Sequence, residues 1–452
     1  MCDDSEHDAD LTRPATEESL VGLNATIASA ADRRSMHAIV SMLENLRVGA
    51  LTVVLPDGRT RVFGDAESDL TATMTIHDWS FFRKLITGGS VGVGEAYMDR
   101  SFSSDDLVSL IRIMIANRKA LKKITLGTLL HIAGDKAIHS ARANRLGQSK
   151  KNIEAHYDLS NALYALFLDP TMTYSAAFFE EPGQDLADAQ LAKYRRLAEK
   201  VKLKPGDHVL EIGCGWGGFA SVAAGEYGAR VTGITLSQEQ AEYARARMVE
   251  EGLSELVEIQ IIDYREVTGT FDKIVSIEML EAVGHRFLDT YFEQVDRMLA
   301  PDGLASIQVI TIPEQRYKNY LRRPDFIQRY IFPGGHLPSL EAMTSSMGKN
   351  TELFVDEVEN IGVHYAETLR CWRENFLGNV QEVRALGFDD RFVRMWEFYL
   401  AYSEGAFLAR YIGDLQVVLT RSMNATLGTE VYGAAHAELS EAKVARALEV
   451  VA

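Results

Sequence analysis

Apolar runs alternate with helical stretches through the second half of the chain. From about residue 200, β-branched and apolar residues recur in DHVLEIG, ARVTGITLS, LVEIQIIDY, FDKIVSIEM and GLASIQVITI, with helical stretches between most of them. Strands separated by helices indicate βαβ units, whose parallel sheet is covered by helices on both faces. The pattern therefore predicts an α/β fold.

The alternation is interrupted by a proline-containing segment. Residues 313–350 carry Pro313, Pro324, Pro333 and Pro338, which are typical of an irregular insertion. Helices are then expected at about 364–377 and 388–409, before a late strand at 415–421. Because loops carried by a rigid scaffold often bear function, we expect the insertion to take part in substrate recognition.

A separate pattern precedes the alternation. Two β-branched runs within 48–65 flank Pro56-Asp57-Gly58, which predicts a hairpin. We expect a helix in 78–102 that ends at Gly88-Gly89 before a second glycine-rich turn, and an amphipathic helix in 105–118. These elements predict a small mixed α/β domain over residues 19–120.

The charge distribution identifies a further segment between the two regions described above. The net charge of −17 argues against nucleic acid as a partner, since phosphates require a basic face. Residues 118–151 are nevertheless strongly basic. We interpret 121–151 as a basic linker, which either forms a solvated helix or attracts anionic lipid head groups. A second domain is then expected over 152–436.

Several classes of protein are not expected. The three cysteines show no spacing suited to zinc or to a disulfide framework, so no metal is predicted. No apolar run of about 18 residues occurs, and the chain begins with acidic and polar residues where an export signal would be basic and then apolar. We expect a cytoplasmic protein.

A glycine-rich loop indicates the cofactor. Gly213, Gly215 and Gly217 follow a predicted strand and open a predicted helix, an arrangement that also fits a nicotinamide dinucleotide. Glu211 would repel a pyrophosphate but suits ammonium and sulfonium charges. The acid expected on a nicotinamide ribose is replaced by Thr235-Leu-Ser237, and Asp263 is placed to accept from an adenine amino group. The loop therefore predicts S-adenosylmethionine.

Longer motifs resemble a known family. The segments NIEAHYDLSNALYALFLDPTMTYSAAFFE, VLEIGCGWGGFA, EMLEAVGH, RYIFPGG, HYAETLRCW and YLAYSEGAF are similar to those of the cyclopropane fatty-acid synthase family. The resemblance implies a class I Rossmann-like methyltransferase domain, an N-terminal domain that helps to engage phospholipid, and a homodimer. It also implies cofactor contacts at Tyr174, Ser175, Gly213, Gly215, Thr235, Gln240 and Asp263.

The family's chemistry implies an apolar channel. Its members methylate the cis double bond of an acyl chain attached to phospholipid, which leaves a carbocation. Such a cation requires a dry, aromatic-walled site. The aromatic residues that we expect there, or else in ordinary core packing, are Tyr330, Phe332, Tyr365, Trp372, Phe376, Tyr399 and Tyr402.

The family is understood to remove the final proton with bound bicarbonate, held by a glutamate, a histidine, a tyrosine and backbone groups beside a cysteine. Glu281 and Tyr365 match the glutamate and the tyrosine. Glu278, expected on the same helix face as Glu281, is assigned a structural role. The expected catalytic positions are Glu281, Tyr365, Gln308, Ala176 and Ile310.

Two of these positions depart from the family pattern. Ala176 stands in place of the cysteine and Gln308 in place of the histidine, so a bicarbonate would be held less tightly or differently. This combination also resembles a branch of the family that makes methyl- or methylene-branched acids. The sequence predicts a cyclopropane-forming enzyme at the inner membrane face. The alternatives are a branched product, which a reductase partner would saturate, and methylation of a soluble small molecule.

Overall fold

The N-terminal part of the chain forms its own small sheet. The structure is a computed structural model that describes residues 29–121, 160–322, 324–424 and 426–427. Four strands pair in the order β2-β1-β3-β4, and helices pack beside them. The elements are α2 (Ala30–Leu43), β1 (Ala50–Val54), β2 (Thr60–Gly64), β3 (Thr71–Ile76), α3 (Phe81–Met98), β4 (Phe102–Ser104), α4 (Leu107–Ala116) and α5 (Arg118–Leu121).

The hairpin predicted in 48–65 is confirmed, because β1 and β2 pair antiparallel from Ala50 opposite Gly64. Helix α3 consists of two helical segments that together span Phe81–Met98 and meet at Gly89. Gly89 makes a sharp break between them, at φ 54° and ψ −135°, a conformation that glycine adopts readily. The predicted helix end at Gly88-Gly89 is therefore confirmed, whereas the prediction of a second glycine-rich turn was wrong, because Gly92 and Gly94 lie within the second helical segment.

The second sheet is the predicted α/β sheet. Its strands run in the order β10-β11-β9-β8-β5-β6-β7, and β9, β8, β5, β6 and β7 are mutually parallel. β11 is antiparallel to both of its neighbours. The strands are β5 (His208–Ile212), β6 (Arg230–Thr235), β7 (Val257–Ile261), β8 (Phe271–Ile277), β9 (Leu299–Thr311), β10 (Leu353–Asn360) and β11 (Gly413–Arg421).

One strand of this sheet was not predicted. β10 is an edge strand whose sequence LFVDEVEN is rich in acids, and only Leu353 in it is buried. It therefore lacks the regular apolar alternation by which a half-buried strand is recognised. Its partner β11, which is buried over most of its length, was found at the expected place.

Helices cover both faces of the large sheet. Val209 of β5 packs in a cluster with Leu197, Phe219 and Ala241, whereas the next residue, Leu210, packs with Phe292 on the other face. The helices of this part are α8 (Asn161–Ala165), α9 (Leu186–Lys200), α10 (Gly218–Gly225), α11 (Gln238–Glu250), α12 (Leu288–Met298), α13 (Glu314–Tyr320), α14 (Leu340–Asn350), α15 (Gly362–Gly378), α16 (Val380–Ala385) and α17 (Asp390–Leu408).

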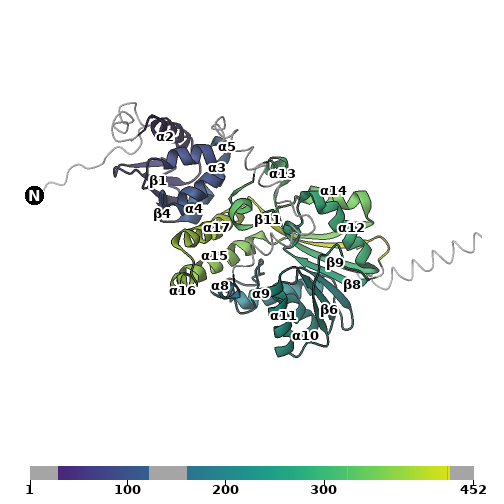
Figure 1. Cartoon of the computed structure of the whole chain (residues 1–452). Coiled ribbons are helices and arrows are strands. Elements are labelled where there is room, and N and C mark those ends of the chain that lie inside the picture. Colours follow the sequence, from purple (N-terminus) through teal and green to yellow (C-terminus); the bar gives the residue numbers. More distant parts are fainter. Residues whose placement is uncertain (1–28, 122–159, 323, 425, 428–452) are drawn as a thin grey trace, which may run out of the picture.

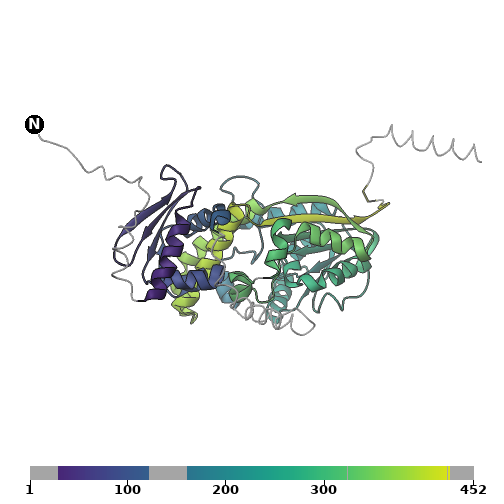
Figure 2. The same ribbon diagram turned by 90° about the horizontal axis from the view of Figure 1, so that it is seen from above.

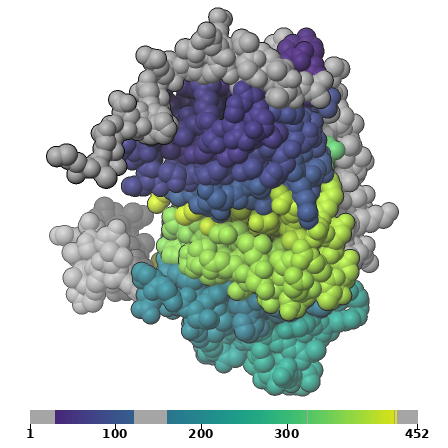
Figure 3. Space-filling model, turned by 90° about the vertical axis from the view of Figure 1, so that its left-hand side faces the viewer, coloured from purple at the N-terminus to yellow at the C-terminus, as the bar shows by residue number. Residues whose placement is uncertain are grey.

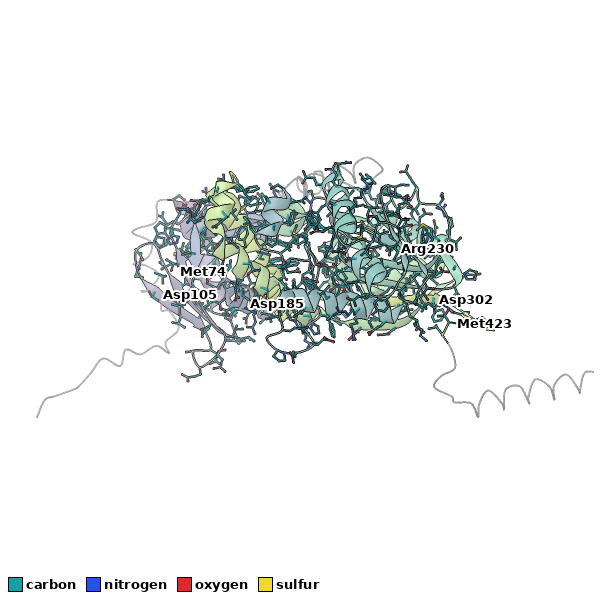
Figure 4. The ribbon with its side chains drawn as sticks, turned by 90° about the horizontal axis from the view of Figure 1, so that it is seen from below. Met74, Asp105, Asp185, Arg230, Asp302 and Met423 are labelled. Carbon is teal, nitrogen blue, oxygen red and sulfur yellow. The ribbon has the colours of Figure 1, made fainter. Side chains whose placement is uncertain are left out.

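Helices α15 and α17 lie between the two sheets (Figure 1, Figure 2). α17 packs against α15 on one side and against α3 and α4 of the N-terminal part on another. Figure 3 shows the resulting layers as successive bands of purple, yellow-green and teal. In Figure 4, Met74 and Asp105 lie toward one end of the molecule, and Arg230, where β6 begins, lies toward the other. The carboxyl ends of the parallel strands thus face the helical layer.

The junction between these layers is tight at Gly94 of α3. A Cβ atom at this position would overlap the ring of Phe326, which is fully buried. We predict that Gly94→Ala lowers the free energy of unfolding by about 1–3 kcal/mol, as overpacking of a core does. Gly88→Ala in the same helix is the matched control, because nothing lies within 4 Å of a Cβ there. Urea denaturation of both variants measures the effect, and equal stabilities would contradict it.

Candidate active site

The glycine-rich loop lies between β5 and the start of α10. Gly213, Gly215 and Gly217 have φ values of 85°, 51° and 83°, in the left-handed region that other residues rarely adopt. A Cβ at Gly213 would come within 2.8 Å of Cγ of Met279, so a larger residue does not fit there. The loop thereby leaves room for a ligand beside the backbone at a helix N-terminus.

This room is a cavity of about 940 Å³, which we call the cofactor cavity. Of the cofactor-binding residues predicted from sequence, those that line it are Tyr174, Ser175, Glu211, Gly213, Gly215, Thr235 and Gln240. Gly217 instead begins α10, and a Cβ there would lie 3.2 Å from that of Ala244. Asp263 lies between lining residues, but its carboxylate accepts hydrogen bonds from Arg265 at 2.6 and 2.8 Å.

Glu211 gives the cofactor cavity its charge preference. Its side chain is buried, and within the described residues its Oε2 atom has no hydrogen-bond partner. Burial raises the pKa of Glu211 to about 8, and the nearby charge of Lys193 opposes this rise. A buried carboxyl group with an unused oxygen suits a cationic ligand, because the ligand charge would favour the ionised form.

Polar side chains lie in and beside the cofactor cavity. Thr235 donates a hydrogen bond to Oε1 of Gln240 at 2.7 Å, which fixes both side chains. Lys193 of α9 is fully buried, and its Nζ donates to Oγ of Ser175 at 2.7 Å. The sequence interpretation did not predict a role for Lys193. The signal was its position on the apolar face of a helix, in register with Leu186, Ala189 and Leu197.

A second cavity of about 1350 Å³ adjoins the first, and we call it the apolar cavity. Of the aromatic residues expected in a channel, Phe332, Tyr365, Tyr399 and Tyr402 line it. Tyr330 instead donates a hydrogen bond to Glu95 at 2.6 Å, and Trp372 and Phe376 are fully buried in the core. Three residues line both cavities and so mark the place where they meet: Tyr174, Glu278 and Ala282.

Glu278 is the centre of this junction. Its Oε1 accepts hydrogen bonds from the backbone N–H of Ala176 at 2.7 Å and from Nε2 of Gln308 at 2.9 Å. Its Oε2 accepts from the hydroxyl of Tyr365 at 2.7 Å. Three positions predicted to act together thus converge on Glu278, which the sequence interpretation had assigned a structural role.

Glu281 lies apart from these donors. Its Oε1 accepts from the backbone N–H of Ile310, and its Oε2 has no partner among the described residues. Burial, and then the charge of Glu278, raise the pKa of Glu281 to about 8. The expectation that Glu278 and Glu281 share a helix face was wrong, because Glu278 is left-handed at φ 51° and Glu281 lies on a 3₁₀ turn, Leu280–Ala282.

Two buried residues of β11 complete the cluster and were not predicted. Gln416 donates from Nε2 to Oε1 of Gln308 at 3.1 Å, across directly paired strands. Asp414 is fully buried, and burial together with the charges of Glu278 and Glu281 raises its pKa well above the usual range. The signal for both was a polar side chain inside an otherwise apolar strand, DLQVVLT.

Comparison with known proteins adds independent evidence. The family model described as mycolic acid cyclopropane synthetase matches residues 144–417. The chain belongs to this family. It is 40% identical to the tuberculostearic acid methyltransferase UfaA1 of Mycobacterium tuberculosis over 75% of this chain and 81% of that protein. It is 38% identical to the cyclopropane-fatty-acyl-phospholipid synthase of Escherichia coli, over 78% and 88%.

Solved structures of cyclopropane synthases share the fold. The cyclopropane synthase MmaA2 from Mycobacterium tuberculosis superposes with a TM-score of 0.57 and 31% identity, over 60% of this chain and 98% of that one. The mycolic acid cyclopropane synthase CmaA1, solved with SAH and CTAB, gives the same values. The predicted class I Rossmann-like fold and the predicted cofactor are thereby confirmed. The protein is an S-adenosylmethionine-dependent methyltransferase.

Bicarbonate, expected from the family resemblance, does not fit the site formed by the hydrogen-bond donors around Glu278 and Glu281. The donors that would hold it are the N–H of Ala176, the amide of Gln308, the hydroxyl of Tyr365 and the N–H of Ile310. Each of them already donates to a carboxylate of the chain itself, three to Glu278 and one to Glu281.

Two features are absent from the described part of the chain. No helix in it is long and apolar enough to cross a membrane. No group of three or more His, Cys, Asp or Glu side chains in it is arranged to hold a metal ion. The basic linker predicted at 121–151 lies almost wholly outside the described residues.

Glu211 provides a test of the cofactor cavity. Because its pKa is about 8 in the free protein, Glu211 is mostly protonated at pH 7 and must ionise to pair with a cation. We predict that S-adenosylmethionine binding at pH 7 releases a proton, that the release fades toward pH 9, and that Glu211→Gln abolishes it. Calorimetry in buffers of different ionisation enthalpy measures it.

The same variant should bind S-adenosylmethionine at least about tenfold more weakly, since a hydrogen bond to a charged group is lost. Gln238→Glu, on the exposed start of α11, is the control for a change of charge alone. Unchanged proton release in Glu211→Gln would show that another group is responsible.

Proposed function

We propose that this enzyme transfers a methyl group from S-adenosylmethionine to the cis double bond of an unsaturated acyl chain carried by a phospholipid, and that the product is a cyclopropane. The observation that carries the proposal is the meeting of the cofactor cavity with the apolar cavity at Tyr174, Glu278 and Ala282. A cavity with a mostly apolar lining suits a hydrocarbon chain, and its contact with the cofactor cavity would bring the chain beside a methyl donor.

The residues of the junction suit the chemistry of a cation. S-adenosylmethionine supplies an electrophilic methyl group, which the electron pair of the double bond attacks. The rings of Tyr174, Phe332 and Tyr399 lie close together, and the hydroxyls of Tyr174 and Tyr399 are hydrogen-bonded at 2.8 Å. Aromatic faces attract a positive charge, and the buried walls exclude water that would capture a carbocation.

Two residues near the junction of the cavities also support an alternative product. Ala176 and Gln308 both adjoin the junction through Glu278, and they are the positions that depart from the cyclopropane-forming pattern. One relative with 40% identity is named for tuberculostearic acid. The same first step, followed by a hydride shift from the methyl-bearing carbon to the cationic carbon and by loss of a methyl proton, would give a methylene-bearing chain, which a partner reductase would convert to a methyl branch. A soluble small-molecule substrate is disfavoured by the apolar lining.

The setting of the enzyme follows from its proposed substrate. An acyl chain that remains on a phospholipid must be drawn from a bilayer, so we propose that the enzyme works as a peripheral protein at the inner membrane face. The family resemblance adds a homodimer to the proposal. The N-terminal part, which packs on α17 next to the apolar cavity, is the proposed lipid-engaging domain.

Labelled cofactor distinguishes the products. With a trideuterated methyl group on S-adenosylmethionine and unsaturated phospholipid vesicles, we predict that mass spectrometry finds two deuterons in the modified chain, because one is lost from the methyl carbon. Chromatography against standards then separates a cyclopropane from a methylene product. Three retained deuterons would exclude the cyclopropane, and modification of free fatty acid alone would exclude the phospholipid substrate.

Glu281 tests the division between the two cavities. It lines the apolar cavity but not the cofactor cavity, so Glu281→Gln should leave S-adenosylmethionine affinity nearly unchanged. Turnover should fall at least about tenfold, because a carboxyl group that can ionise in response to the developing cation is replaced by an amide that cannot. Titration calorimetry and lipid product assays measure the two effects. A collapse of cofactor affinity would assign Glu281 to the cofactor site instead.

A further inference from the structure

We propose that the carboxylate of Glu278 is the built-in base of this enzyme, which takes the proton that the acyl cation loses and occupies the place expected for a bound bicarbonate. The inference rests on the proposed methyl transfer to an acyl double bond. It goes beyond that reaction by naming the group that completes it.

The position of the carboxylate is the first argument. Glu278 lines both cavities, so it lies where the cofactor cavity and the apolar cavity meet. The groups implied to hold a bicarbonate, which are the N–H of Ala176, the amide of Gln308 and the hydroxyl of Tyr365, all donate to it at 2.7–2.9 Å. A side-chain carboxylate presents a pair of oxygen atoms similar to that of a bicarbonate. The carboxylate of Glu278 already accepts hydrogen bonds from all three of these donors.

The side-chain amide of Gln308 is oriented to donate to Glu278. Oε1 of Gln308 accepts a hydrogen bond from Gln416 at 3.1 Å, so its amide must present N–H groups on the other side. Those N–H groups reach Glu278 and, at 3.3 Å, the carbonyl of Ala176. Glutamine at this position therefore fits a fixed carboxylate of the chain, to which a neutral donor is sufficient.

The distribution of charge in the carboxyl cluster is the second argument. Glu278 is the member with three donors, and such hydrogen bonds favour the ionised form. Glu281 and Asp414 have buried oxygens without donors in the described structure, and burial and the charge of Glu278 raise the pKa of both. The negative charge of the cluster is thus concentrated on Glu278, and burial raises the pKa of this carboxylate, which makes it a stronger base.

The backbone of Glu278 is the third argument. Its φ of 51° lies in the left-handed region, where glycine is the favoured residue. A glutamate at such a position is disfavoured unless its surroundings hold it there, and conformations of this kind cluster at functional sites. The conformation directs the side chain from the end of β8 to the junction.

For a cyclopropane, a C–H bond of the transferred methyl group breaks, and its electron pair forms the third C–C bond of the ring with the cationic carbon. For a methylene product, a hydride first moves from the methyl-bearing carbon to the cationic carbon, and the electron pair of a methyl C–H bond then forms the C=C group. The proton forms an O–H bond on Glu278 and returns to solvent when the cavity empties. Glu281, which also lines the apolar cavity, remains beside the cation and can ionise in response to its charge.

The test compares two substitutions in buffers freed of carbon dioxide, with unsaturated phospholipid vesicles as substrate. Glu278→Gln keeps the size and removes the basicity, so product formation should fall at least about 100-fold and stay low when bicarbonate is added. Glu278→Gly suits the left-handed backbone and leaves the donors of Ala176, Gln308 and Tyr365 open. Its activity should also fall, and millimolar bicarbonate should restore it at least about tenfold.

The wild-type enzyme provides the decisive control. Its rate should be unchanged by removal or addition of bicarbonate. A wild-type rate that depends on bicarbonate, a Glu278→Gln variant within about threefold of wild type, or a folded Glu278→Gly variant that bicarbonate does not restore would each overturn the inference. If the wild type modifies no acyl lipid under any of these conditions, the proposed function fails instead.

Discussion

A buried carboxylate at the meeting point of two cavities is the constraint around which the active site is built. An isolated charge inside a protein is costly, so Glu278 requires donors from several elements at once. They come from the chain before α9, from β9 and from α15, in the form of Ala176, Gln308 and Tyr365. Gln416 of β11 then has to orient Gln308. One ionised group thereby fixes four segments that are distant in sequence.

The fold was largely predictable because its signals are local. Repeated apolar runs with helices between them identify the parallel strands, and the glycine-rich loop places the cofactor at the end of the first of them. The exceptions have local causes as well. β10 carries too many acids to be recognised as a strand, and Gly92 and Gly94, which suggested a second turn, lie within the second helical segment of α3.

The active site was predictable as a set of residues but not as a set of contacts. The family resemblance brought Ala176, Gln308, Tyr365 and a glutamate together, yet it favoured Glu281 over Glu278. Two glutamates three residues apart are neighbours on a helix, and only the left-handed backbone at Glu278 and the 3₁₀ turn after it separate their directions. Lys193, Asp414 and Gln416 belong to no motif, and their importance follows from burial that only the folded chain shows.

Helix α17 both lines the apolar cavity and packs against the N-terminal part. Tyr399, Tyr402 and Phe407 on this helix line the apolar cavity, while Gly405 approaches Ile111 and Val108 of α4 so closely that a Cβ there would lie 2.9 Å from the Ile111 side chain. This wall of the apolar cavity is therefore supported on its other side by α4 of the N-terminal part. Because both rest on the same helix, a shift of the N-terminal part would change the width of the apolar cavity.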